Sequence, residues 1–126
     1  MSAGKRVTFH TAMSDSELVD KYREARLTVI PAVMDGGYTT ALESMACGTP
    51  VVAANVGSLP ELVQDGKTGW VTPANDGHAL KEKIACLMHN ASLAAVMGQA
   101  GRERILEQFT WDAVVQQYLH VYATGV

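Results

Sequence analysis

The chain has 126 residues, of which 48% are hydrophobic and 18% are charged, which is typical of one folded domain and excludes an intrinsically disordered protein. Its formal net charge is −3 and it has no run rich in Lys or Arg, so a nucleic-acid partner is not expected. No apolar stretch approaches the ~20 residues that cross a bilayer, so we expect no transmembrane segment.

The cysteine and histidine content argues against metal or disulfide chemistry. Two cysteines, Cys47 and Cys86, are too few for a disulfide framework, and both fall in helix-like segments. The four histidines show no metal-ligand spacing, so we expect neither a metal site nor a cofactor. These features predict a soluble protein of the reducing cytoplasm.

Short β-prone runs alternate with helical patterns along the chain. The run 27–30 is continuously apolar and stops at Pro31, and the run 50–54 also lacks alternation, as expected for strands that are buried on both faces. The predicted strands are residues 7–10, 27–30, 50–54 and 70–72.

Capping residues mark the helices between and after these strands. Ser14 and Glu17 have the spacing of a capping box, Gly48 stands at the usual helix end, and Thr110 is the expected cap of the last helix. The predicted helices cover about 15–25, 39–47, a short turn after Gly57, 77–90, 92–108 and 111–123.

Strands separated by helices of about ten residues indicate parallel βαβ units. We therefore predict an α/β fold, a Rossmann-like parallel sheet of about four strands flanked by helices. Ligands of such open sheets bind beyond the carboxyl ends of the strands. The loop after Ile30 lies at such an end and is the first place to expect a ligand.

That loop combines glycines, a helix start and two acidic residues. Gly36 and Gly37 allow a ligand to approach the backbone, and the amides that begin the next helix favour an anionic group. Asp35 and Glu43, with seven residues between them, can accept hydrogen bonds from sugar hydroxyls. Phosphate on the amides and hydroxyls on the carboxylates describe a nucleotide-sugar site. A tight turn with acidic caps is the structural alternative.

Residues 31–52 contain, in order, a proline, a short loop, the Asp35–Glu43 pair, and the run Glu43-Ser44-Met45-Ala46-Cys47-Gly48-Thr49-Pro50-Val51-Val52. This set resembles the signature of the family 4 (group 1) glycosyltransferases, which are retaining nucleotide-sugar enzymes of GT-B fold. The likeness continues through 57–63, 65–69, Arg102 and 109–111, and so spans nearly the whole chain.

The resemblance implies roles for individual residues. In that family the donor lies against the carboxy-terminal Rossmann-like domain, so Asp35, the catalytic candidate, would contact the transferred sugar, and Glu43 would bind the ribose hydroxyls. The first amides of the helix would meet the diphosphate of the donor, which is a substrate, so no cofactor or metal is implied. The implied donor-binding residues are Asp35, Gly36, Gly37, Tyr38, Thr39 and Glu43.

The resemblance also implies that residues 1–126 form a single, partial carboxy-terminal domain. The family has a first domain that holds the acceptor and a basic pair near the start of the second domain, and neither is expected in this chain. The expected partners are therefore a nucleotide sugar and a missing acceptor-binding domain or subunit. The isolated chain is expected to be inactive.

The implied strand order leaves one edge of the sheet open. By resemblance, the four predicted strands are numbers 3, 4, 5 and 6 of the order 3-2-1-4-5-6, so strand 27–30 lacks its usual neighbour. An open apolar edge is an aggregation hazard. We expect residues 7–10 to pair with it within one chain, combined with a homodimer contact.

Two functions remain open on the sequence. The first is the donor-binding part of a retaining glycosyltransferase, which moves a sugar from a nucleotide diphosphate sugar to an acceptor hydroxyl. The alternative is a non-catalytic relative or engineered fragment that serves as a folding or assembly module. A flavodoxin-like signalling domain would need a strand-end acidic cluster with a lone phosphorylatable Asp, which the sequence lacks.

Overall fold

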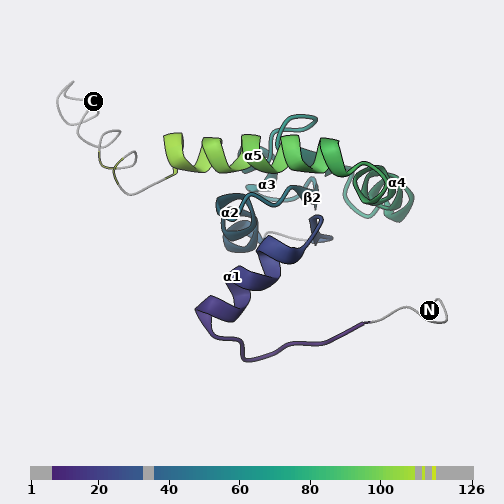
Figure 1. The fold of residues 1–126 in the computed structure, drawn as a ribbon. Helices are drawn as coiled ribbons and strands as arrows, with labels where there is room; N and C mark the ends of the chain where they lie inside the picture. Colours follow the sequence, from purple (N-terminus) through teal and green to yellow (C-terminus); the bar gives the residue numbers. More distant parts are fainter. Residues whose placement is uncertain (1–6, 33–35, 110–111, 113–114, 116–126) are drawn as a thin grey trace, which may run out of the picture.

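The computed structural model of the chain describes residues 7–32, 36–109, 112 and 115. Helices and strands alternate along these residues, as the sequence predicts for an α/β fold (Figure 1). The elements are α1 Asp15–Glu24, β1 Thr28–Ile30, α2 Tyr38–Ala46, β2 Val51–Ala54, α3 Leu59–Leu62, β3 Gly69–Thr72, α4 Gly77–Met88 and α5 Ala91–Gln108.

The three strands form one parallel sheet in the order β1-β2-β3. Thr28 of β1 lies opposite Val51 of β2, which in turn lies opposite Gly69 of β3. All four residues of the central strand are buried, which accounts for its unbroken apolar sequence.

Helices cover both faces of this sheet. One core cluster joins Ile30 of β1 to Met45 of α2 and to the buried leucines of α3. A second cluster joins Val52, on the other face of β2, to Leu87 of α4 and to the start of α5. The long helix α5 begins beside α4 and runs past α3 and α2, and so it connects the two clusters (Figure 1).

Helix α1 begins as the capping box predicts. The Ser14 hydroxyl accepts a hydrogen bond from the Glu17 amide at 3.3 Å and donates one to the Glu17 carboxylate at 2.9 Å. The only buried residue of α1 is Tyr22, whose carbonyl accepts a hydrogen bond from the Thr49 hydroxyl. This contact fixes the end of α1 to the turn that precedes β2.

The predicted strand at residues 7–10 is wrong, and the sheet has three strands instead of four. These residues have no strand partner among the described residues, and their side chains are exposed, with 62% of Val7 and 90% of Phe9 accessible. An extended run gains hydrogen bonds only beside another strand. Because α1 is fixed to the turn before β2 at its end, its start leads the segment away from the sheet (Figure 1).

The remaining element predictions hold to within one or two residues. The second helix begins at Tyr38 instead of 39, and Gly48 follows its end with a φ of +79°. The helix predicted at 111–123 lies almost entirely outside the described residues. Within the part of the chain that the structure describes, no helix has the length and apolar character that crossing a bilayer requires.

We predict that Gly98→Ala destabilises the fold. A Cβ at this position of α5 would lie 2.0 Å from the carbonyl oxygen of Gly48. Alanine is the better helix former by ~1 kcal/mol, but overpacking against backbone costs about 1–3 kcal/mol, so the clash dominates. Urea unfolding should show a lower free energy of unfolding for Gly98→Ala.

The matched control is Gly77→Ala, because a Cβ at Gly77 has no atom within 4 Å. This variant should unfold at the same urea concentration as the unmodified chain, or slightly higher. Equal stability of the two variants would contradict the proposed close packing of α5.

Candidate functional site

The start of α2 lies at the carboxyl end of β1. The Ala41 amide donates to the Gly37 carbonyl at 2.9 Å. The amides of Tyr38, Thr39 and Thr40 donate to no backbone carbonyl of the described residues, as expected for the first turn of a helix. With the positive end of the helix dipole, they form a place for an anion.

Gly37 shapes this helix start. Its φ of +77° is a left-handed conformation that favours glycine, and no side chain caps the helix here. A Cβ on Gly37 would lie 2.4 Å from Cγ2 of Ile30. The sequence predicts that Gly37 leaves room for a ligand to approach the backbone. The side chain of Ile30, the last residue of β1, occupies part of this room.

Glu43 lies in the second turn of α2. It lines a cavity between α1 and α2. The cavity has a volume of about 200 Å³, and its walls are mainly apolar. No described Lys or Arg forms an ion pair with Glu43, so its carboxylate is free to accept hydrogen bonds from a ligand. The residues that line this cavity are Asp15, Leu18, Val19, Tyr22, Glu43, Ala46 and Cys47.

The electrostatics of this cavity connect Glu43 to Tyr22. Burial raises the pKa of the Tyr22 phenol, and the negative charge of Glu43 raises this pKa further, with a smaller contribution from Cys47. The Thr40 side chain lowers this pKa and so acts in the opposite direction. The sequence placed Tyr22 on the apolar face of α1, and nothing in the sequence indicated that it would lie beside Glu43.

A buried group of hydroxyls holds α2 in position. The Ser44 hydroxyl, which is fully buried, lies 2.8 Å from the Thr28 hydroxyl of β1 and 3.0 Å from the Thr49 carbonyl. Thr49 in turn donates to the carbonyl of Tyr22 in α1. One residue next to Glu43 thus ties α2 to β1 and to the turn before β2, which also holds α1.

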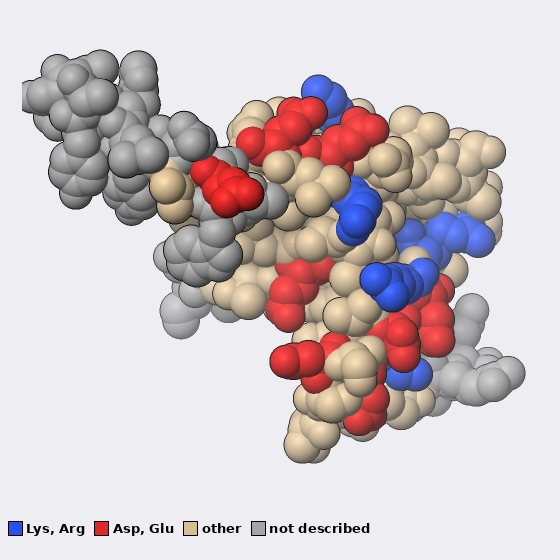
Figure 2. Space-filling model, turned by 60° about the vertical axis from the view of Figure 1, so that its left-hand side comes forward, with Lys and Arg blue, Asp and Glu red and all other residues tan. Residues whose placement is uncertain are grey.

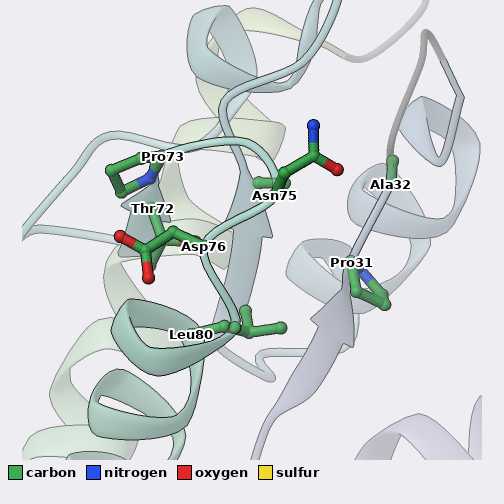
Figure 3. Close-up of a pocket in the computed structure, with 9 residues that line it drawn as sticks. Pro31, Ala32, Thr72, Pro73, Asn75, Asp76 and Leu80 are labelled. Atoms are coloured by element: carbon green, nitrogen blue, oxygen red, sulfur yellow. The ribbon is translucent and has the colours of Figure 1, made fainter.

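A second cavity lies where the rule for open sheets predicts, beyond the carboxyl ends of all three strands. Its volume is about 220 Å³, and Pro31 and Ala32 face the loop between β3 and α4 across it (Figure 3). Asp76 caps α4 by accepting from the Ala79 amide at 2.9 Å, so its carboxylate is already engaged. The lining residues are Pro31, Ala32, Ala54, Thr72, Pro73, Asn75, Asp76, Gly77 and Leu80.

The predicted site residues are therefore only partly brought together. Gly36, Gly37, Tyr38 and Thr39 follow one another into the start of α2. Glu43 is on the same helix but faces the cavity beside α1, and none of these residues lines the cavity at the strand ends. The remaining candidate, Asp35, lies outside the described residues.

The described surface carries charges of both signs, and the thiols and carboxylates on it form no metal cluster. Figure 2 shows acidic and basic side chains as neighbours on one face of the molecule. Among the residues that the structure describes, no group of three or more His, Cys, Asp or Glu is placed to hold a metal ion. Cys47 and Cys86 are free thiols.

Comparison with known proteins establishes the family. Residues 2–104 match the family described as glycosyl transferases group 1. The chain belongs to this family. It is 40% identical over 104 residues to the alpha-maltose-1-phosphate synthase of Mycolicibacterium smegmatis, an alignment that covers 78% of this chain and 27% of that protein.

Two further relatives show the same relation. The chain is 36% identical over 121 residues to the D-inositol 3-phosphate glycosyltransferase of Rhodococcus jostii, covering 93% of this chain and 26% of that protein. The sucrose-phosphate synthase of Thermosynechococcus elongatus superposes with a TM-score of 0.85 and 35% identity, covering 96% of this chain and 30% of that chain. The group 1 resemblance and the Rossmann-like α/β fold are confirmed, and the chain spans about a quarter of the length of these curated relatives.

We predict that Gly37→Ala costs more stability than Gly48→Ala. Both glycines have a left-handed φ, +77° and +79°, and so both variants bear the backbone cost of about 1–2 kcal/mol. Only at Gly37 would the new Cβ also meet a side chain, that of Ile30, whereas nothing lies within 4 Å at Gly48. Thermal and urea unfolding of the two variants should differ, and identical losses would contradict the contact with Ile30.

We also predict that Glu43→Gln lowers the pKa of Tyr22 toward its usual value, because the substitution removes a negative charge that disfavours the phenolate. Above a pH of about 10 the phenol of Tyr22 loses its proton in the unfolded chain more readily than in the folded chain. The free energy of unfolding therefore falls as the pH rises through this range. The loss should be smaller in Glu43→Gln.

NMR of carbon-labelled tyrosine, assigned with Tyr22→Phe, measures this pKa directly. The control is Asp20→Asn, which removes an exposed carboxylate of the same helix that does not contribute to the shift. An unchanged Tyr22 pKa in Glu43→Gln would show that the two side chains are not neighbours in solution.

Proposed function

We propose that this chain is the donor-binding part of a retaining glycosyltransferase and holds a nucleoside diphosphate sugar whose sugar passes to an acceptor hydroxyl. The observation that carries the proposal is the arrangement of α2. The amides of its first turn have no backbone partner among the described residues, and in its next turn Glu43, which pairs with no described Lys or Arg, lines a cavity. Membership of the group 1 family supports the assignment to sugar transfer.

The diphosphate would lie at the start of α2. Gly37 leaves this end without a side-chain cap, so the amides of Tyr38, Thr39 and Thr40 are open to phosphate oxygens. A helix of nine residues also places a partial positive charge there. Asp35 remains the proposed contact to the transferred sugar, a role carried over from the family resemblance.

The ribose would lie against Glu43. A carboxylate without an ion-pair partner accepts two hydroxyl hydrogen bonds, and such charge-assisted bonds are stronger than neutral ones. Leu18 and Val19, which line the same cavity, offer an apolar wall for the nucleoside. The first acid of the motif and the second acid would thus hold different parts of one donor.

The chemistry we propose for the site relies on positioning and electrostatic stabilisation. The free amides would stabilise the negative charge that develops on the leaving diphosphate, and the carboxylates would orient the sugar and ribose. The named relatives differ in the product or acceptor that their names state, so no particular sugar or acceptor is proposed. Because this chain spans about a quarter of their length, the proposal concerns donor binding and not a complete transferase.

Calorimetric or NMR titration with UDP and GDP tests the proposal. We expect weak binding with a Kd near the millimolar range, about −4 kcal/mol, and shifts that map to residues 36–43. Glu43→Gln should weaken binding by about 1.5–3 kcal/mol, the contribution of hydrogen bonds to a charged group. The preference for UDP over 2′-deoxy-UDP should fall in this variant, because the 2′-hydroxyl loses its acceptor.

The control is Glu107→Gln, which neutralises an exposed carboxylate on α5, outside the cavity that Glu43 lines. This variant should bind UDP as the unmodified chain does. Shifts that map elsewhere, or binding that Glu43→Gln leaves unchanged, would exclude the proposed donor site.

A further inference from the structure

The face of α1 that lines the cavity with Glu43 carries a second carboxylate at its start. Four residues of this helix line the cavity, and they are spaced as one helix face: Asp15, Leu18, Val19 and Tyr22. Asp15 and Tyr22 are seven residues apart, so they lie about 10 Å from each other along the helix. From its start onward, this face therefore presents a carboxylate, two aliphatic side chains and a phenol.

The capping of α1 leaves the Asp15 carboxylate unengaged. Ser14 caps the helix together with Glu17, and the two side chains lie 2.9 Å apart. Asp15 forms no side-chain hydrogen bond and no ion pair with another described residue. Its oxygens are therefore available to a molecule in the cavity, and an ionised carboxylate can only accept hydrogen bonds.

The other end of the cavity indicates which part of a nucleotide reaches Asp15. In the donor site proposed above, Glu43 holds the ribose. The negative charge of Glu43 raises the pKa of the Tyr22 phenol, so these two side chains are neighbours and Asp15 lies at the opposite end of the α1 face. A base attached to that ribose would extend along Leu18 and Val19 and bring its outer edge to Asp15. The separation along α1 is of the order of the length of one nucleoside.

We propose that Asp15 contacts the base of the donor and selects guanine, so that the preferred donor class is a GDP-sugar. The outer edge of guanine has two adjacent donors, N1–H and the N2 amino group, and one carboxylate accepts from both in a bidentate pair. This inference rests on the proposed donor site and adds to it the identity of the base.

The other common bases fit Asp15 less well. Uracil has one N–H between two carbonyl oxygens, and a carboxylate repels these oxygens. Adenine and cytosine each place an amino group beside a ring nitrogen that is an acceptor, so each forms a single hydrogen bond with a carboxylate. A site with an acceptor pair therefore disfavours these bases as well as favouring guanine.

Titration of the chain with the diphosphates of guanosine, inosine and uridine, by calorimetry or NMR, tests the proposal. GDP should bind about tenfold more tightly than UDP or better, because it forms two hydrogen bonds to a charged group where UDP meets repulsion. Inosine diphosphate lacks the N2 amino group and should bind with an affinity between these two.

Asp15→Asn separates recognition of the base from an effect on the fold. The asparagine amide has one acceptor and one donor side by side. This pattern matches xanthine, which has N1–H beside a carbonyl oxygen at C2, and no longer matches guanine. The variant should lose the preference for GDP over UDP and should bind xanthosine diphosphate more tightly than the unmodified chain does. A variant that had only lost structure would gain affinity for no nucleotide.

The matched control is Asp20→Asn, which neutralises an exposed carboxylate of the same helix that does not line the cavity. This variant should keep the preference for GDP. Equal affinities of the unmodified chain for GDP and UDP, or a preference that Asp15→Asn leaves unchanged, would overturn the inference, although weaker binding by Glu43→Gln would still support the donor site. If Glu43→Gln binds both nucleotides as the unmodified chain does, the donor site itself is wrong, and the role of Asp15 is overturned with it.

Discussion

The complete burial of β2 is the constraint on which the rest of the structure depends. A strand without any exposed residue requires helices on both sheet faces, and the two core clusters supply them, one through α2 and α3 and the other through α4. Helix α5 bridges these clusters and passes so close to the turn before β2 that Gly98 has no room for a side chain. The position of α2, and with it the candidate site, follows from this packing.

The turn before β2 holds the helices on either side of the site in position, although it does not line the site. Thr49 accepts a hydrogen bond from Ser44 of α2 through its carbonyl and donates one to α1 through its hydroxyl. Thr49 therefore fixes both α1 and α2, the two helices that form the walls of the cavity lined by Glu43. A site built in this way depends on helix placement, which the core determines.

The sequence predicts well those features that depend on neighbouring residues. The capping box at Ser14, the apolar runs of the strands and the glycine after α2 are local signals, and the elements they predict are present. The strand expected at residues 7–10 fails because a strand exists only beside a partner, which no local pattern guarantees. The same limit applies to Glu43: its place on α2 follows from the helical pattern, but the cavity that it faces depends on where α1 packs.

The attachment of α1 at a single end has a mechanical consequence. Its one buried residue, Tyr22, and its hydrogen bond from Thr49 lie near the carboxyl end of the helix. The amino-terminal half has no buried residue, and its contribution to the gap opposite Glu43 comes from the partly buried side chains Leu18 and Val19. A substitution at Thr49 would therefore alter the width of this gap without touching any residue that lines it.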